Sequence, residues 1–274
     1  MTLPAKDARE LISFYLEAGV DMLVDEEPVD RFADEAPLRP AASPPAVPAP
    51  ALSGRPPPRQ ALEERVLFQA APAAPEAAIM AARQTAKGAE TLDALRALLE
   101  TFEGCMLRAT ATQLVFADGN PQARVMFVGE APGRDEDLAG LPFVGRSGKL
   151  LDRMMVAIGL DRSKAYIANI VPWRPPGNRT PTPHESAICL PFIHRQIELA
   201  NPDFLVCLGQ PSTQTLLGTR EGITRTRGRW FKFDTGRREI RALATYHPAF
   251  LLRSPLQKRL AWRDFLSLQK ALAD

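Results

Sequence analysis

The chain has 274 residues, of which 45% are hydrophobic and 24% charged. This ordinary balance excludes a fully disordered or fibrous protein. No run of about 18 apolar residues occurs, so we expect no transmembrane helix. The acidic first 30 residues lack a signal-peptide pattern, and three cysteines without such a signal favour a reducing cytoplasm.

Charge and proline are distributed unevenly along the chain. Residues 1–36 hold ten acidic and three basic residues, a net charge of −7. Because the whole chain carries +2, the remainder carries +9, which suits a polyanionic partner such as nucleic acid. Eleven of the 26 prolines lie in residues 37–75. We therefore predict an acidic helical arm over 1–36, a Pro/Ala-rich linker over 37–87 and a folded domain over 88–274.

Hydrophobic periodicity predicts the elements in chain order. Apolar residues at helical spacing favour an amphipathic helix at 7–23, a brief helix at 60–70 and a further helix at 88–103, which Thr91 would cap. From about residue 120, short apolar runs alternate with helical patterns. The expected strands are 123–129, 165–171, 203–209 and 238–247, and the expected helices are 146–158, 184–200 and 256–273.

This alternation predicts an α/β fold, with a parallel sheet covered by helices on both faces. Ligands of such sheets bind beyond the carboxyl ends of the strands. Carboxylates, an amide, an aromatic ring and a histidine follow the predicted strands here, as a hydrolytic site requires. A general nucleotide-binding protein is disfavoured because neither GxxxxGK[ST] nor GxGxxG occurs.

Five strings in these segments resemble motifs of the uracil-DNA glycosylase superfamily, and most closely those of family 4. The resemblance covers about residues 100–274 and keeps the family's order. It implies a three-layer α/β/α sandwich with a central four-stranded parallel sheet, and a catalytic role for the domain at 88–274. The strings are GEAPGRDEDLAGLPFVG (129–145), Asn169 before RPPGNR (174–179), LGQ (208–210), RGRW (227–230) and YHPAFLLR (246–253).

The resemblance implies excision of uracil from DNA by hydrolysis of its N-glycosidic bond, the first step of base excision repair. The base would be flipped into a pocket. By similarity, His247 donates a hydrogen bond to uracil O2, where negative charge develops, and Asn169 reads the base edge. Phe143 resembles the aromatic residue that stacks on the flipped ring, and Gly129 would border the base.

The residue that activates water is less defined by the resemblance. Glu130 matches the glutamate of the GE-x-PG motif, and a carboxylate there could orient water and stabilise the sugar cation. The neighbouring carboxylates Asp135, Glu136 and Asp137 compete for this role. We favour Glu130, with Glu136 next.

Binding of the DNA backbone is expected from basic residues and from a helix N-terminus at 145–149, where a phosphate could bind. The candidate contacts are Ser147, Lys149, Arg174, Arg179, Arg227 and Arg229. Leu251, Leu252 and Arg253 resemble the wedge that fills the vacated base stack.

Family 4 members carry an iron–sulfur cluster held by four cysteines, and this chain departs from that pattern. The four positions are Phe102, Cys105, Trp173 and Cys189. Two thiolates cannot hold the usual four-thiolate cluster, so we predict no cofactor. The aromatic residues would instead fill the volume by packing, and Cys207 would be a core residue of a strand.

We therefore expect a monofunctional, cytoplasmic enzyme that acts as a monomer on uracil-containing single- or double-stranded DNA, without a membrane. The alternative is a catalytically inactive DNA-binding relative that keeps the fold. The presence of Glu130, Phe143, Asn169 and His247 together favours the active enzyme.

Overall fold

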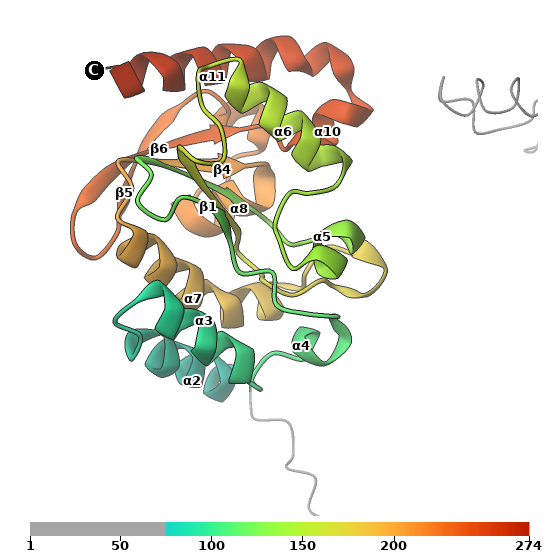
Figure 1. Cartoon of the computed structure of the whole chain (residues 1–274), viewed down its shortest axis with the longest axis vertical. Coiled ribbons are helices and arrows are strands. Elements are labelled where there is room, and N and C mark those ends of the chain that lie inside the picture. Colours follow the sequence, from blue (N-terminus) through green and yellow to red (C-terminus); the bar gives the residue numbers. More distant parts are fainter. Residues whose placement is uncertain (1–74, 274) are drawn as a thin grey trace, which may run out of the picture. The chain divides into compact units, whose positions relative to one another are not determined.

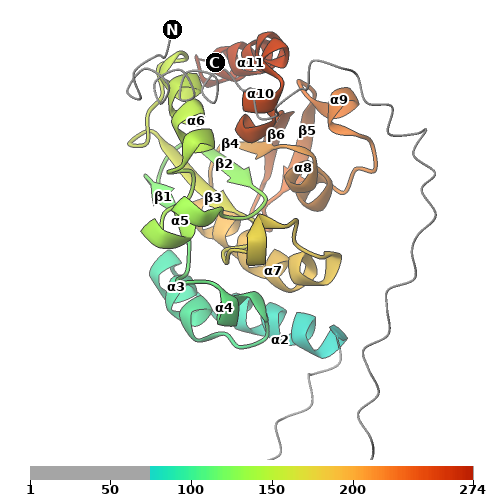
Figure 2. The same cartoon turned by 90° about the vertical axis from the view of Figure 1, so that its right-hand side faces the viewer.

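A computed structural model describes residues 75–273. The predicted arm at 1–36 and the helices predicted at 7–23 and 60–70 lie outside the described residues. Within this range a central sheet is sandwiched between two layers of helices, as Figure 1 shows and the turned view in Figure 2 repeats. The predicted α/β class and the three layers are confirmed.

The sheet has six strands in the order β1-β3-β2-β4-β6-β5. The four central strands β3, β2, β4 and β6 run parallel, as predicted. The sequence reading missed the two edge strands, β1 and β5, which pair antiparallel with β3 and β6. The strands are β1 (Asp118–Gly119), β2 (Val125–Gly129), β3 (Ala165–Asn169), β4 (Phe204–Leu208), β5 (Trp230–Asp234) and β6 (Glu239–Thr245).

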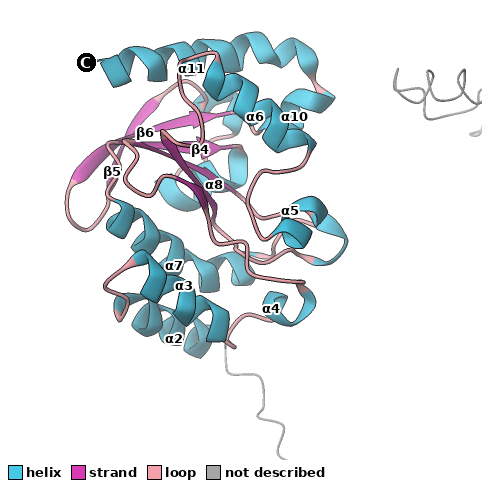
Figure 3. Cartoon of the chain, in the orientation of Figure 1, coloured by secondary structure: helices cyan, strands magenta, loops and turns pink. Residues whose placement is uncertain are grey.

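Helices cover both faces of the sheet (Figure 3). On one face lie α2 (Pro75–Lys87), α3 (Leu92–Thr101) and α7 (Pro183–Ala200); on the other lie α6 (Arg146–Val156) and α11 (Lys258–Ala273). Each predicted helix from residue 88 onward is confirmed, and Thr91 caps α3 by accepting from Ala94 N–H. The short helices are α4 (Leu107–Thr110), α5 (Arg134–Ala139), α8 (Gln210–Leu217), α9 (Ile223–Thr226), α10 (Pro248–Arg253) and the 3₁₀ turns η1 (Pro176–Asn178) and η2 (Pro255–Gln257).

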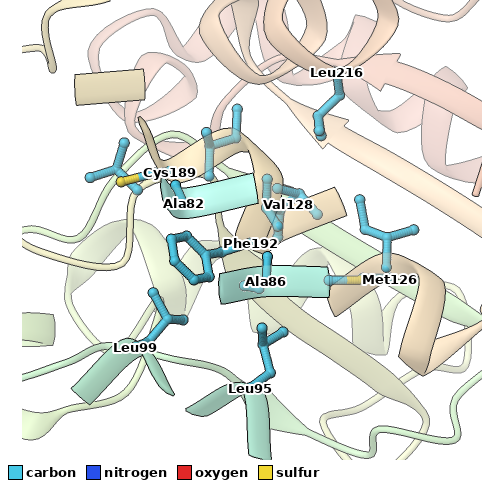
Figure 4. Close-up of a cluster of buried hydrophobic side chains, with 14 of the residues drawn as sticks. Ala82, Ala86, Leu95, Leu99, Met126, Val128, Cys189, Phe192 and Leu216 are labelled. Atoms are coloured by element: carbon cyan, nitrogen blue, oxygen red, sulfur yellow. The ribbon is translucent and has the colours of Figure 1, made fainter. Parts of the chain in front are cut away.

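Two hydrophobic clusters hold the layers to the sheet. Under α2, α3 and α7, Phe192 packs with Leu95, Leu99 and sheet residues Met126 and Val128 (Figure 4). The α6/α11 side has its own cluster, built around Phe127, Leu151 and Phe265. The strands β2, β3 and β4 are buried along their whole length, which is why their sequences are continuously apolar rather than alternating.

The predicted linker over 37–87 is corrected at its end, because residues 75–87 form helix α2. This segment is rich in alanine, the best helix former, and Ala78, Ala82 and Ala86 recur at four-residue spacing. All three are buried, in the cluster that includes α7. High alanine content is common to linkers and helices, and only the four-residue period of the buried alanines distinguishes a helix face here.

Among the described helices, none combines the length and apolar character that crossing a bilayer requires.

Candidate active site

A pocket of about 210 Å³ opens at the carboxyl ends of the parallel strands, where the sequence reading placed the site. It brings together Glu130, Phe143, Asn169 and His247, which come from segments far apart in the chain. Ser147 at the start of α6 also lines it. The remaining lining comes from the segment after β2, from the loop after β3 and from Ala249 beside His247. These residues are Ala131, Pro132, Gly133, Glu136, Pro175, Asn178, Arg179, Thr180, Pro181 and Ala249.

Glycine at 129 lets the pocket's side chains approach the sheet. Gly129, at the end of β2, is paired in register with Asn169 at the end of β3. A Cβ on Gly129 would lie 2.4 Å from Asn169 Oδ1 and 2.7 Å from the Phe143 ring. Any larger residue would therefore displace one of these two side chains. Gly129 itself is not among the residues that line the pocket; it lies behind Asn169 and Phe143 and leaves room for their side chains.

Phe143 is buried, and its backbone has a φ of 55°, in the left-handed region that non-glycine residues rarely adopt. Its ring lies beside His247, with the centroids 5.5 Å apart. The backbone behind it is equally tight, because a Cβ on Gly148 would lie 1.7 Å from the Phe143 carbonyl oxygen. The loop thus presents an aromatic face to the pocket from a strained and closely packed backbone.

His247 follows β6 and caps helix α10. Its Nδ1 accepts a hydrogen bond from Ala249 N–H at 3.1 Å. Burial, with a smaller contribution from the Arg253 charge, lowers the pKa of His247 to about 4. The imidazole is therefore neutral near pH 7, and since Nδ1 is the acceptor, the proton resides on Nε2. A neutral ring with one fixed donor is the species that the resemblance requires.

Asn169 carries an unusual polar atom. Its side-chain oxygen Oδ1 is buried and accepts no hydrogen bond; among the described residues it is the one buried side-chain polar atom so left. Leaving such an atom unpaired costs about 1–3 kcal/mol. An unpaired acceptor that lines a pocket is explained if a ligand supplies the missing donor.

The carboxylates near the pocket have different surroundings. Glu130 lines the pocket, and burial raises its pKa. Glu136 is already engaged: Oε1 accepts from Val144 and Gly145 N–H at 3.1 and 2.9 Å, and Oε2 accepts from Gly133 N–H at 3.1 Å.

The other two competitors are also placed differently from Glu130. Asp137 accepts from the Thr112 backbone and hydroxyl, each at 2.8 Å, and lies outside the pocket lining. Asp135 is exposed on the first turn of α5. Glu136 and Asp137 thus hold loops together, whereas Glu130 lines the pocket and burial is the cause of its pKa shift, with no hydrogen bond to its carboxylate among the described residues.

A second hollow of about 480 Å³ adjoins the pocket and shares Ser147, Asn178 and Ala249 with it. It runs past the N-terminus of α6, whose cap residue Gly145 provides no side-chain acceptor. Its border includes Arg146, Leu252 and Arg253, which are exposed. Lys149 is exposed one turn along α6. Lys149 and Arg253 form no ion pair within residues 75–273.

Two predicted DNA contacts, Arg174 and Arg179, are engaged with partners in the loop after β3 and in the neighbouring helices α5 and α7. Arg174 donates to Asn178 Oδ1 at 2.6 Å and lies 3.7 Å from Asp137. Arg179 makes a bidentate pair with Glu185 at 2.6 and 2.8 Å. The latter contact lowers the pKa of Glu185 to about 2. Both arginines lie beside the pocket, with their charges partly neutralised by protein partners.

Other predicted DNA contacts lie elsewhere. Arg227 points inward, where it pairs with the buried Asp264 and donates to the Leu260 carbonyl at 3.0 Å. Arg229 pairs with Glu221 at 2.6 Å. Leu251 is only 1% exposed, so of the three wedge residues the structure brings Leu252 and Arg253 to the surface, but not Leu251.

The four cluster positions lie in one apolar cluster. Phe102, Cys105, Trp173 and Cys189 are all buried there, and the Phe102 ring packs edge-on against Phe192 at 4.9 Å. The contact between the two thiols lowers the pKa of Cys105 and raises that of Cys189. No group of three or more His, Cys, Asp or Glu suited to a metal occurs within residues 75–273. Two thiols and two rings do not fit a four-thiolate cluster. Cys207 is buried in β4, as expected.

The sequence analysis predicts no role at the site for Arg162. It lies between α6 and β3 and donates to the carbonyl oxygens of Pro142, at 3.2 Å, and Phe143. No local motif marks such a residue, because its partners lie 10 to 44 residues away in the chain. The positive φ of Gly209 was also unpredicted; there a Cβ would lie 2.9 Å from the Cβ of His247.

Comparison with known proteins supports the resemblance. The family model described as the Uracil DNA glycosylase superfamily matches residues 116–266. Three proteins named "Type-4 uracil-DNA glycosylase" are similar to the chain. That of Archaeoglobus fulgidus is 39% identical over 64% of this chain and 90% of its own length. That of Thermotoga maritima is 43% identical over 55% of this chain and 77% of its own length. That of Sulfurisphaera tokodaii is 37% identical over 66% of this chain and 84% of its own length.

Proposed function

The chain belongs to the uracil DNA glycosylase superfamily, and we propose that it is a uracil-DNA glycosylase that flips uracil out of DNA and hydrolyses its N-glycosidic bond. The reaction leaves an abasic site and begins base excision repair. Bond cleavage builds positive charge on the sugar and negative charge on the departing base. The site must stabilise both charges more strongly in the transition state than in the ground state.

The observation that carries this proposal is the unpaired Oδ1 of Asn169 inside the pocket. Uracil offers an N3–H donor between two carbonyl acceptors, so its edge supplies what Oδ1 lacks, while the Asn169 amide N–H donates to O4. Cytosine has an acceptor at N3 and an amino group at C4, so in this orientation of the amide it would set N3 against Oδ1 and its amino group against the Asn169 amide N–H. The buried acceptor thereby favours uracil over cytosine.

His247 and Glu130 act on opposite charges of the transition state. The neutral imidazole donates from Nε2 to uracil O2, where negative charge collects; its orientation is held by the Ala249 bond to Nδ1. Glu130, ionised and without a hydrogen-bond partner in the described residues, orients water and stabilises the sugar cation. Glu136 is unsuited to this role because both its oxygens already accept backbone bonds.

Phe143 stacks on the flipped base, and the adjoining hollow holds the DNA strand. Backbone N–H groups at the start of α6, with Ser147 and Lys149, bind a phosphate. Arg253 and Leu252 border the same hollow and face the gap that the base leaves. Arg174 and Arg179 reach the DNA backbone by exchanging their loop partners for phosphates.

We also propose that the enzyme works without a cluster, as a single chain, in the cytoplasm. The donor set at the four cluster positions supports the first point, because two aromatic rings replace thiolates. The residues to which the reaction is assigned, Glu130, Asn169 and His247, meet in one pocket of this chain, so excision requires no residue from a second copy. The three cysteines, all free thiols, suit a reducing compartment.

Incubation with single- and double-stranded oligonucleotides that carry one uracil, followed by alkaline cleavage, tests the proposal. Wild-type protein should cleave at the uracil, and His247→Ala should lose about 10²–10³ in rate. Arg124→Met serves as a control, because Arg124 binds Asp203 and the Leu272 carbonyl at the other end of β2. No excision by the wild-type protein on either substrate would favour the inactive DNA-binding relative.

A further inference from the structure

We propose that Arg162 is a positioning residue that holds Phe143 in the pocket. The inference rests on the proposed function, since Phe143 is taken as the ring that stacks on the base. Arg162 itself lies outside the pocket lining, in the turn between α6 and β3. It therefore acts through the Phe143 backbone rather than on the base.

The Arg162 guanidinium uses its whole set of donors. Its Nε donates to Asp152 at 2.9 Å, one terminal nitrogen to Asp118 and the Pro142 carbonyl, and the other to the Phe143 carbonyl and the second Asp152 oxygen. A guanidinium has five N–H donors in a rigid fork, and five acceptors meet it here. Asp118 and Asp152 thereby fix the orientation of the Arg162 guanidinium. The guanidinium in turn holds the carbonyl groups of the two consecutive loop residues Pro142 and Phe143.

Glu136 holds the same loop from the other side. The Pro142 and Phe143 carbonyls accept from Arg162, and the next two N–H groups, of Val144 and Gly145, donate to Glu136. Four consecutive residues thus have a backbone group tied to a charged side chain. Each such charge-assisted bond is about twice as strong as a neutral one.

This two-sided restraint explains the strain at Phe143. A non-glycine residue with a φ of 55° is strained and persists only where its surroundings over-determine it. Without Arg162, the carbonyls of Pro142 and Phe143 lose their partners and the backbone can relax. The Phe143 ring, whose centroid now lies 5.5 Å from that of His247, would then move away from it.

The test compares Arg162→Met and Arg162→Lys with the Arg124→Met control, which also removes an ion pair and an arginine–carbonyl bond, but at the far end of the sheet. Arg162→Met should lower kcat by about 10- to 100-fold, the loss expected when a substrate-positioning group shifts by about 1 Å. The KM for DNA should stay within about threefold, because the DNA contacts are intact. Arg162→Lys keeps the charge but loses the fork, so its kcat should fall as well.

A double-mutant cycle separates positioning from a general structural effect. In a Phe143→Leu background, which has no aromatic ring to place, Arg162→Met should lower kcat by less than about twofold, because residues that act as a unit are not additive. An equal loss in both backgrounds would overturn the proposal. A wild-type kcat in Arg162→Met would overturn it too, while leaving the proposed uracil excision standing.

A crystal structure tests the proposal without an activity assay, and so applies even if the wild-type protein excises no uracil. A crystal structure of Arg162→Met should show Phe143 outside the left-handed region and its ring displaced from His247. If Phe143 keeps its positive φ and its contact with His247, Arg162 does not position it. Failure of the proposed function alone would leave this structural outcome intact.

Discussion

Phe143 and His247 lie side by side, with ring centroids 5.5 Å apart and planes inclined by 31°, although they come from loops after β2 and β6. The pair joins an apolar face to a fixed hydrogen-bond donor at one pocket wall. A flipped base needs both features: a surface for its π-face, and a donor in the plane of its carbonyl.

Asn169 should contribute strongly to uracil excision and little to the stability of the folded protein. Asn169→Ala relieves the cost of the unpaired acceptor but also removes buried packing, so the two effects should largely offset and the unfolding free energy should change by less than about 1 kcal/mol. The single-turnover rate of uracil excision should fall by about 10²–10³. Denaturant unfolding and single-turnover kinetics measure the two quantities.

Thr245→Val is the contrasting variant for Asn169→Ala. The Thr245 hydroxyl is buried and donates to Asp264 at 2.7 Å, so its removal should destabilise the protein by about 1–3 kcal/mol. Equal destabilisation by both variants would mean that Asn169 Oδ1 has a partner in the free protein.

His247 should titrate far below an ordinary histidine. Its pKa lies at about 4, below the usual 6.5, because burial and the Arg253 charge disfavour the charged ring. The folded protein therefore prefers the neutral form, and the stability linked to it is complete above pH 6.5 and lost as pH falls toward 4. Histidine ring NMR, assigned with His247→Asn, should show a proton on Nε2 at pH 7. A titration near pH 6.5 would contradict this account.

Ionisation of Glu130 should set the acid limb of the pH–rate profile of uracil excision. Burial raises its pKa above the usual 4.5, and the carboxylate must be ionised to orient water. Excision should therefore slow as pH falls through this raised pKa, and Glu130→Gln should slow the reaction and abolish the limb. Asp135→Asn, which neutralises an exposed carboxylate on the same loop, should keep the wild-type profile. Loss of the acid limb in Asp135→Asn would assign the role to Asp135.

The positions of the missing cysteines should behave as ordinary core. Phe102→Ala should cost about 3–5 kcal/mol of unfolding free energy, since Phe102 is buried and packs on Phe192. Met106→Ala, nearby and 76% exposed, should have little effect. Metal analysis of protein purified without oxygen should find iron far below one cluster per chain. Stoichiometric iron with the visible absorbance of a thiolate-bound cluster would contradict the proposal.

The sequence predicted the central layers well because their signal is local. Continuous apolar runs marked β2, β3 and β4, which are buried on both faces. The edge strands were not predicted because β1 has only two residues and β5 has a single buried residue among its five. Neither presents the buried run that identifies a central strand.

Tertiary partners explain the remaining differences at the site. The motif strings place Glu130, Phe143, Asn169 and His247, which do meet in one pocket. Arg227 looked like a DNA contact because its partner, Asp264, lies 37 residues further along the chain. Burial of Leu251 likewise depends on packing from other helices, through Ala261 of α11 and through Leu150 and Met154 of α6, about 100 residues earlier in the chain. Charge and hydrophobicity identify residue types, but only the fold decides which of them face solvent.

The most direct test of the account is a crystal structure of the protein soaked with free uracil. We predict the base stacked on Phe143, its N3–H bound to Asn169 Oδ1 and its O2 within hydrogen-bond distance of His247 Nε2. Uracil bound elsewhere, with Asn169 Oδ1 still unpaired, would contradict it.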